Sequence, residues 1–376
     1  MWSNIIGQGR VKHILRSAMQ HGKLPGAYLF SGPAGTGKDA AAIELAKALN
    51  CVNASGDSFE ACDECPSCTA IANFASPALE FIHVLPKKSD DEGAELKEDD
   101  VAIVREQRAA KAADPYYHIE IPRATAIHIA QVRELRLSMA RSIAGANRRV
   151  IIISEADKMN DQSQNAFLKT LEEPHADTLI VLTSSNPNAL LPTVRSRTQD
   201  VRFDVLSVEE IRKALMDRES LTEADADFLA RLAAGRYTRA RDMMGEDVKQ
   251  MRTEIVGFLR MGLSKSRRKA QIEIDRFLPR SGGKFLEKRQ VVEQRLALLA
   301  LWLRDALALA THAEREVINR DQMEDLAKFV SRLGEPRRII AALAAVDRAM
   351  HRVRLQLQLR SVMMQLIVEL EEALLS

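Results

Sequence analysis

The stretch AYLFSGPAGTGK, residues 27–38, decides the fold class of this chain. Its first five residues form a short apolar run, and residues 40–49 beyond it show the apolar spacing of a helix. The segment between them matches the pattern G-x-x-x-x-G-K, in which glycines let backbone N–H groups surround a phosphate. We therefore predict a strand, a phosphate-binding loop and a helix, with the loop residues Gly32, Pro33, Gly35, Thr36, Gly37 and Lys38.

The alternation of predicted strands and helices continues to residue 204. Short runs rich in β-branched residues lie at residues 79–84, 150–154 and 179–183. Helical periodicity separates the later runs, at residues 129–143 and 162–173. Strands separated by helices imply a parallel sheet with helices on both faces, so we predict a three-layer α/β domain over residues 1–204.

The remainder of the chain carries helical patterns and no strand signals. Residues 208–215 follow Ser207, which suits a helix N-cap. The final helix, residues 354–375, has a broad apolar surface suited to packing against other helices. We predict two all-helical domains, at residues 205–265 and 266–376.

Composition excludes some classes of protein and identifies one unusual segment. No stretch approaches the roughly 18 apolar residues that a membrane helix needs, and the first residues lack a signal peptide, so we expect a cytoplasmic protein. The net charge of +2 argues neither for nor against a nucleic-acid partner. Residues 87–113 are highly charged and nearly devoid of large apolar side chains, which predicts an exposed insertion, partly helical or disordered.

The residues expected to hold magnesium depart from the usual pattern. After the loop lysine a serine or threonine normally ligates the metal, but this chain has Asp39. The strand at 150–153 ends in Ser154 and Glu155, so a hydroxyl replaces the first of two carboxylates and the second remains to orient attacking water. Two interpretations stay open: nucleotide binds weakly or statically without turnover, or Asp39 and Ser154 have exchanged their roles at the metal.

All four cysteines of the chain lie within eighteen residues, at Cys51, Cys62, Cys65 and Cys68. Thiolates at this spacing, in a chain without an export signal, fit tetrahedral zinc better than disulfides. Four protein ligands leave no open coordination position, which predicts a structural zinc module at residues 51–70 inside the α/β domain.

Together these motifs resemble those of bacterial clamp-loader subunits of the AAA+ class. The resemblance rests on WSNIIGQ at residues 2–8, the phosphate loop, the cysteine module behind it, SEADKMNDQSQNAFLKTLEEP at 154–174 and LLPTVRSRTQ at 190–199. Asp39, Ser154 and the EADKM phrase make the chain more similar to the delta-prime type than to the tau/gamma motor type. The two helical domains are then expected to be a lid and an oligomerisation collar.

The resemblance implies roles for further residues. Arg197, in Ser196-Arg197-Thr198, corresponds to an arginine finger that acts on the ATP of a neighbouring subunit. The remaining nucleotide-site positions implied by the family are Ile6 and Gly7 near adenine, Ser184 as a polar sensor, and Arg239 as a second sensor.

The resemblance also implies partners and cofactors. The implied partners are the delta and tau/gamma subunits in a hetero-pentamer, the sliding clamp, and primer-template DNA facing Arg133 and Arg136. The implied cofactors are structural zinc and ATP with magnesium, for which binding without hydrolysis is one of the two open interpretations. Two alternatives remain: an ATP-hydrolysing motor of tau/gamma type, and a zinc-containing regulator that binds nucleic acid.

Overall fold

The computed structural model describes residues 2–54, 59–86, 98–139, 147–173, 177–245, 254–259, 267–278, 285–333, 335–355 and 357–375. The chain divides into two compact units, Met1–Asp242 and Met243–Ser376. The division into three domains, with boundaries after residues 204 and 265, stays a prediction.

The first unit is built on a parallel sheet of five strands in the order β2-β3-β4-β1-β5. The strands are β1 (Ala27–Ser31), β2 (Leu79–Ile82), β3 (Arg149–Ile153), β4 (Thr178–Ser184) and β5 (Gln199–Arg202). The first four confirm the predicted runs. The sequence analysis missed β5 because it is a short edge strand in which only Val201 is buried.

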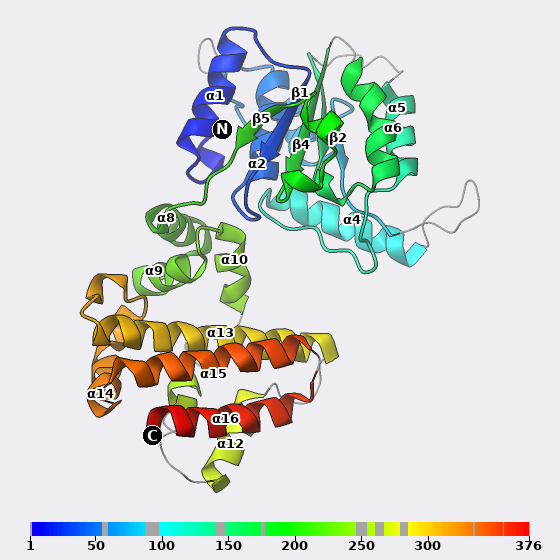
Figure 1. Cartoon of the computed structure of the whole chain (residues 1–376). Helices are drawn as coiled ribbons and strands as arrows, with labels where there is room; N and C mark the ends of the chain where they lie inside the picture. The colour runs from blue at the N-terminus through cyan, green and yellow to red at the C-terminus, as the bar shows by residue number, and fades with distance from the viewer. Residues whose placement is uncertain are drawn as a thin grey trace. The chain divides into compact units, whose positions relative to one another are not determined.

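Side chains alternate across the sheet and build one core on each face. Tyr28 and Phe30 of β1 belong to the core shared with α1 (Gly9–Gln20) and α2 (Lys38–Asn50). Leu29, between them, belongs to the opposite core, with α5 (Ile129–Met139) and α6 (Asp161–Glu172). Figure 1 shows these helix pairs on the two sides of the sheet. The unit is thus the predicted three-layer α/β domain.

Three helices, α8 (Val208–Glu219), α9 (Glu223–Leu232) and α10 (Tyr237–Asp242), complete the first unit. The predicted N-cap at Ser207 is confirmed: its hydroxyl accepts from the Glu210 N–H at 3.2 Å, and the Glu210 carboxylate accepts from the Ser207 N–H at 2.8 Å. This reciprocal capping box satisfies two backbone donors that a helix start otherwise leaves unpaired.

The charged insertion contributes the helix α4 (Glu98–Ala113), while residues 87–97 lie outside the described part of the chain. The expectation that this segment is exposed is wrong for Asp100 and Lys111, which are buried. The remaining helical elements of the unit are α3 (Pro66–Ala72), α7 (Pro192–Arg195) and the short 3-10 turns Trp2–Asn4, Ala156–Lys158 and Pro187–Ala189.

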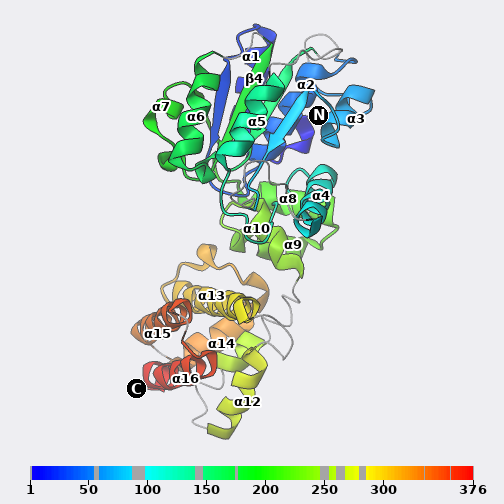
Figure 2. The same cartoon turned by 90° about the vertical axis from the view of Figure 1, so that its right-hand side faces the viewer.

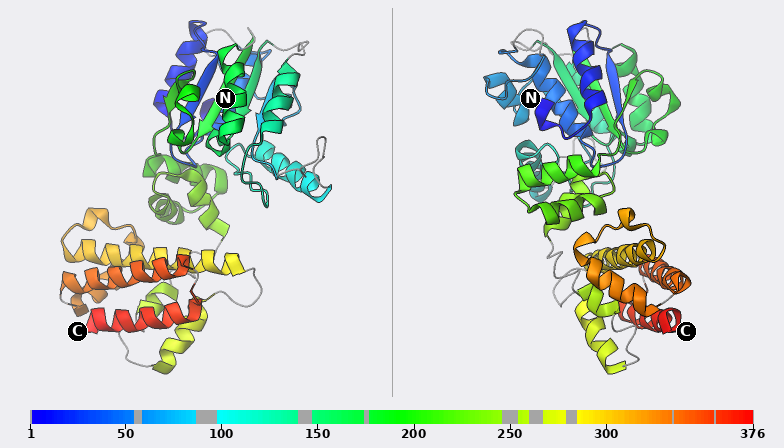
Figure 3. Two further views of the ribbon diagram at one scale, coloured as in Figure 1. Left: turned by 45° about the vertical axis from the view of Figure 1, so that its right-hand side comes forward. Right: turned by 90° about the vertical axis from the view of Figure 1, so that its left-hand side faces the viewer.

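The second unit is helical throughout its described residues. Its helices are α12 (Arg267–Phe277), α13 (Phe285–Ala310), α14 (Met323–Leu333), α15 (Pro336–Arg354) and α16 (Leu359–Leu375), with 3-10 turns at Met243–Gly245, Glu314–Glu316 and Arg320–Gln322. Helix α15 packs between α13 and α16, and the yellow, orange and red helices lie side by side in Figure 3. Among the described residues, no helix is long and apolar enough to cross a membrane.

Candidate functional site

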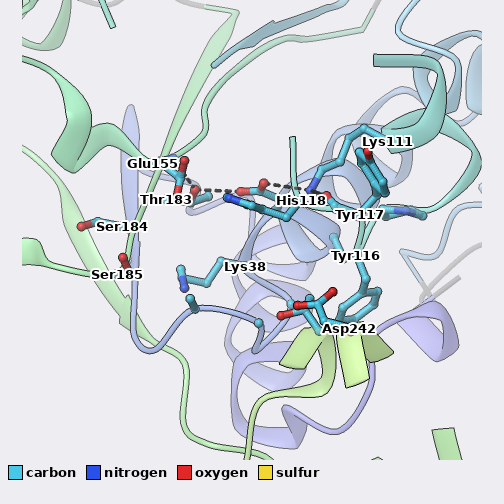
Figure 4. A pocket seen from close by; sticks show the side chains of 17 residues that line it. Lys38, Lys111, Tyr116, Tyr117, His118, Glu155, Thr183, Ser184, Ser185 and Asp242 are labelled. Atoms are coloured by element: carbon cyan, nitrogen blue, oxygen red, sulfur yellow. Dashed lines mark hydrogen bonds and ion pairs between the residues drawn. The ribbon is translucent and has the colours of Figure 1, made fainter. Parts of the chain in front are cut away.

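The phosphate loop, Asp39, Glu155 and Ser184 meet at the carboxyl ends of β1, β3 and β4. Strand β1 lies between β4 and β5, whereas the next strand along the chain, β2, lies at the far edge beyond β3. Such a change of direction leaves a crevice at the strand ends. The crevice holds a cavity of about 290 Å³, whose lining includes Gly35, Gly37, Lys38, Asp39, Glu155, Thr183 and Ser184 (Figure 4).

The phosphate loop requires its glycines because residues from other segments lie directly against it. Gly37 has φ +94°, and a Cβ there would lie 2.7 Å from the Tyr116 hydroxyl. Gly35 has φ +77°, and a Cβ there would collide with the hydroxyl of Thr238. Only glycine adopts these backbone angles without strain and leaves the space that the two hydroxyls occupy.

The loop lysine is buried and bonded to its own loop. Lys38 Nζ donates to the carbonyl oxygens of Gly32 at 2.8 Å and Pro33 at 2.7 Å. Burial lowers the pKa of Lys38 to about 8, against the attraction of the carboxylates of Asp39, Asp157 and Glu155. The ammonium is therefore held inside the curve of the loop by two backbone carbonyls.

Asp39 of α2 is the centre of a hydrogen-bonded network that reaches α4, the end of β3 and β4. Its Oδ2 accepts from Lys111 Nζ at 3.0 Å and from Ser154 Oγ at 2.8 Å, and its Oδ1 accepts from Thr183 Oγ1 at 2.7 Å. Lys111 Nζ also donates to the Tyr117 carbonyl at 2.7 Å. Burial opposes the charge on Asp39, but Lys111 and the two hydroxyls outweigh it and hold its pKa at about 2.

This network occupies the two positions where related phosphate-loop sites normally have their magnesium ligands. Asp39 and Ser154 are hydrogen-bonded to each other, and the Lys111 ammonium lies on the same carboxylate oxygen. A divalent cation bound to Asp39 would have a positive charge as its close neighbour, which opposes binding. The described residues therefore do not fit magnesium coordinated by Asp39 and Ser154.

The segment predicted to contact adenine is hydrogen-bonded to Tyr116, which follows the charged insertion. The backbone N–H of Ile6 donates to the Tyr116 hydroxyl at 2.7 Å, and Gly7 lies against Glu210 of α8. Tyr116 is buried, which raises its pKa to about 12, and its ring packs edge-on against Tyr237 with centroids 5.1 Å apart. Tyr116 thus joins the N-terminal segment to α10 beside the loop.

Sequence reasoning missed Lys111 and Tyr116. Neither belongs to a motif, and Lys111 is 72 residues from Asp39 along the chain. A signal did exist: a carboxylate in place of the usual hydroxyl, at the start of a buried helix, needs a cation or several donors nearby.

Of the other residues predicted for the nucleotide site, Glu155 and Ser184 line the cavity and Arg239 does not. Glu155 lines the cavity with a left-handed backbone, φ 52°, and burial raises the pKa of its carboxyl. Ser184 lines it as well and is buried. Thr238 and Asp242 of α10 line the cavity, whereas Arg239 is exposed and is not among the lining residues.

Arg197 lies away from this cavity, in the turn after α7. Figure 2 shows α7 beside α6. Arg197 Nη2 donates to Glu172 Oε1 at 2.7 Å, and Nη1 donates to the Thr193 carbonyl at 3.0 Å. The side chain is 36% exposed and does not line the cavity of its own chain. Its guanidinium is thus ordered and accessible from outside.

The four cysteines converge as predicted, with all Sγ atoms within 4.8 Å of one another. Cys51 Sγ and Cys65 Sγ are 4.0 Å apart, close to the spacing of roughly 3.8 Å that tetrahedral zinc–sulfur bonds impose. Backbone N–H groups of Cys62, Cys65 and Cys68 donate to neighbouring cysteine sulfurs, as expected for thiolates that hold a metal. The cluster therefore has the donors and spacing to bind a zinc ion.

The cysteine module also holds the N-terminus. Trp2 Nε1 donates to the Phe59 carbonyl at 3.1 Å, and Asn4 Nδ2 donates to Asp63 Oδ2 at 2.9 Å. Lys47 of α2, the helix that follows the phosphate loop, donates to the other Asp63 oxygen at 2.6 Å. The module thus ties residues 2–4 to α2, directly before the segment at Ile6.

The Asp39–Lys111 pair predicts a loss of stability on substitution. We expect Lys111→Met to lower the free energy of unfolding at pH 7 by roughly 3 kcal/mol, because removing one partner strands the other charge in a largely buried site. The measurement is urea unfolding, with Lys213→Met on the exposed surface as the matched control. Equal urea midpoints for Lys111→Met and wild type would show that the Asp39–Lys111 pair does not stabilise the folded state.

The same network predicts how this contribution depends on pH. The folded-state pKa of Asp39, about 2, lies below its ordinary value of 3.8, so its contribution is complete above pH 3.8 and is lost as pH falls towards 2. The stability advantage of wild type over Asp39→Asn should therefore shrink by about 2 kcal/mol between pH 5 and pH 2. Asp204→Asn, at an exposed carboxyl, should show no such trend.

Metal removal should release the N-terminus. In a Trp302→Phe variant Trp2 is the remaining tryptophan, and it is 1% exposed. We expect one zinc per chain by colorimetric assay, and a red shift of Trp2 emission when a chelator removes it, with far-UV circular dichroism largely retained. Cys68→Ser should abolish zinc binding and show the red shift without chelator. A zinc-free preparation with unshifted emission would overturn this prediction.

Comparisons with known proteins identify the family of this chain. The model of the family described as DNA polymerase III, delta subunit, matches residues 7–207, more than half of the chain. DNA polymerase III subunit delta' of Bacillus subtilis is 24% identical over 369 residues, covering 97% of this chain and 96% of that protein. Subunit delta' of Pseudomonas aeruginosa is 28% identical over 260 residues, covering 68% and 63%.

Motor-type relatives match over a shorter region. DNA polymerase III subunit gamma/tau of Mycobacterium tuberculosis is 27% identical over 237 residues, which are 62% of this chain but 34% of that protein. A solved gamma subunit-related protein of Thermotoga maritima is 17% identical and covers 96% of this chain, with a TM-score of 0.37, too low to support an argument. The chain belongs to the DNA polymerase III delta-subunit family, which confirms the predicted resemblance to delta-prime clamp-loader subunits.

Proposed function

We propose that this clamp-loader subunit of delta-prime type supplies Arg197 to the ATP site of a neighbouring subunit and hydrolyses no ATP itself. The proposed absence of hydrolysis rests on one observation: Asp39 is hydrogen-bonded to Lys111, Ser154 and Thr183. Phosphoryl transfer from ATP depends on a metal ion that bridges the outer phosphates and neutralises developing charge. In this chain Asp39 and Ser154, which stand at the positions that would hold the metal ion, are hydrogen-bonded to each other.

Two neighbouring features support a site without turnover. The Ile6 N–H, which the family resemblance assigns to adenine, is hydrogen-bonded to Tyr116. The Lys38 ammonium, which would meet the outer phosphates, is hydrogen-bonded to the carbonyls of Gly32 and Pro33. Nucleotide binding would have to replace these bonds as well as tolerate the Asp39 carboxylate, so any binding would be weak and static.

The role of Arg197 is supported by its place and its surroundings. A finger that acts on another subunit must be exposed, outside its own cavity and held in a defined orientation. Arg197 meets all three conditions, since Glu172 and the Thr193 carbonyl hold a guanidinium that is 36% exposed. A guanidinium placed at a neighbour's γ-phosphate would stabilise the charge that develops there during hydrolysis.

The proposed assembly is a hetero-pentamer with delta and tau/gamma subunits that acts on the sliding clamp and primer-template DNA in the cytoplasm. The helical second unit is suited to the collar role because α16 leaves Met364 and Val368 exposed although they are apolar. Arg133 and Arg136 are exposed on one face of α5, where they could track DNA phosphates. The cysteine cluster is expected to carry structural zinc.

A second candidate, an ATP-hydrolysing subunit of tau/gamma type, has one observation in its favour. Lys38 and Glu155, the phosphate-binding and water-orienting residues of such a motor, both line the cavity. The Lys111 cation beside Asp39 favours the first candidate. Activity of the isolated chain separates the two.

The isolated chain should show no magnesium-dependent ATPase above background. The measurement is phosphate release from ATP at saturating magnesium, with Lys38→Ala as the matched control for contaminating ATPases. Turnover that depends on Lys38 and is abolished by Asp39→Ala would instead support exchanged roles of Asp39 and Ser154, and would favour the motor candidate.

Arg197→Ala should greatly reduce the ATPase rate of a clamp loader reconstituted with the partner subunits. A finger contributes roughly 10³-fold or more to the rate at the site it completes, so the loader should lose most of the activity of the neighbouring site. Arg195→Ala, two residues away and also exposed, is the matched control and should retain the rate. Unchanged activity and clamp loading with Arg197→Ala would refute the assigned role.

A further inference from the structure

We infer that Glu172 is a positioning residue that holds Arg197 in the orientation needed to reach a neighbouring subunit. The inference rests on the proposed function of Arg197. Glu172 is the last residue of α6, and its carboxylate lies 2.7 Å from Arg197 Nη2. On this account the glutamate touches neither nucleotide nor phosphate and acts through the arginine alone.

The contact fixes the plane of the guanidinium. The Glu172 carboxylate accepts a hydrogen bond from Nη2, while the Thr193 carbonyl accepts one from Nη1 at 3.0 Å. Two anchors on different nitrogens leave the planar group little freedom to rotate. A guanidinium has five N–H donors, so three remain to meet the oxygens of a phosphate.

The backbone around Arg197 is anchored to the same helix. Gln164, a buried residue of α6, donates to the carbonyls of Met159 at 3.0 Å and Ala189 at 3.2 Å. Its Oε1 accepts from the Leu191 N–H at 2.7 Å, one residue before α7 begins. Helix α6 therefore holds the chain that leads into α7 through Gln164, and holds the end of the arginine side chain through Glu172.

This arrangement separates positioning from binding. A long arginine side chain that is free in solution must lose rotational freedom when it meets a phosphate, and this loss weakens catalysis. The bond to Glu172 orders the side chain before the subunits meet. Its removal should therefore lower the rate of the neighbouring site without changing how tightly that site binds ATP.

The test is a double-mutant cycle in the complete, reconstituted clamp loader. The variants are Glu172→Ala, Glu172→Gln, Arg197→Ala and the double variant, and steady-state ATPase yields kcat and KM for each. We expect Glu172→Ala to lower kcat roughly two- to fivefold, the range of one partly exposed ion pair, with KM unchanged. Glu172→Gln keeps an acceptor oxygen and should restore part of the rate.

Two controls separate positioning from a general structural effect. Glu173→Ala removes the adjacent exposed carboxylate and should leave kcat unchanged. In the Arg197→Ala background, Glu172→Ala should have no further effect, because there is no guanidinium left to hold. An equal drop in kcat in both backgrounds would show a structural role and overturn the inference.

The outcomes also distinguish this inference from the function on which it rests. If Arg197→Ala lowers kcat and Glu172→Ala does not, Arg197 keeps its role and the inference about Glu172 fails. If Arg197→Ala leaves kcat unchanged, the proposed function fails and the inference fails with it.

Discussion

The ion pair between Asp39 and Lys111 is the interaction on which the rest of the nucleotide site depends. It joins the helix after the phosphate loop to the end of α4, and the hydroxyls of Ser154 and Thr183 add β3 and β4 to the same carboxylate. A charge with 20% of its side chain exposed is stable there because every element around it contributes a donor or a positive charge. The cavity is thus organised around a structural carboxylate.

The proposed role follows from a difference between the residues that face the cavity and the exposed Arg197. The side chains of Asp39, Tyr116 and Lys38 face the cavity and form hydrogen bonds with other residues of the same chain. Arg197, at the end of α7, faces outward and is ordered by α6. The proposed function requires a subunit that responds little to nucleotide and presents a fixed group to its neighbour, and this arrangement suits both requirements.

The sequence predicted those parts of the structure that depend on local pattern. Four buried strands, the phosphate loop and the cysteine cluster each have a spacing that the backbone geometry dictates, and each was found. Strand β5 was missed because an edge strand needs little apolar surface. Lys111 and Tyr116 were missed because their roles arise from tertiary contacts between distant segments, and a charged helix near the surface has no local pattern that marks one lysine as buried.

The buried pair also restricts how this site can evolve. Restoring a hydroxyl at position 39 alone would leave the Lys111 ammonium without its carboxylate, and replacing Lys111 alone would leave the carboxylate without its cation. Each single step towards a metal-binding site therefore passes through a less stable protein, and Tyr116 would still hold the Ile6 N–H. The absence of hydrolysis that we propose would therefore be hard to reverse, because a metal-binding site would require several changes that are favourable only together.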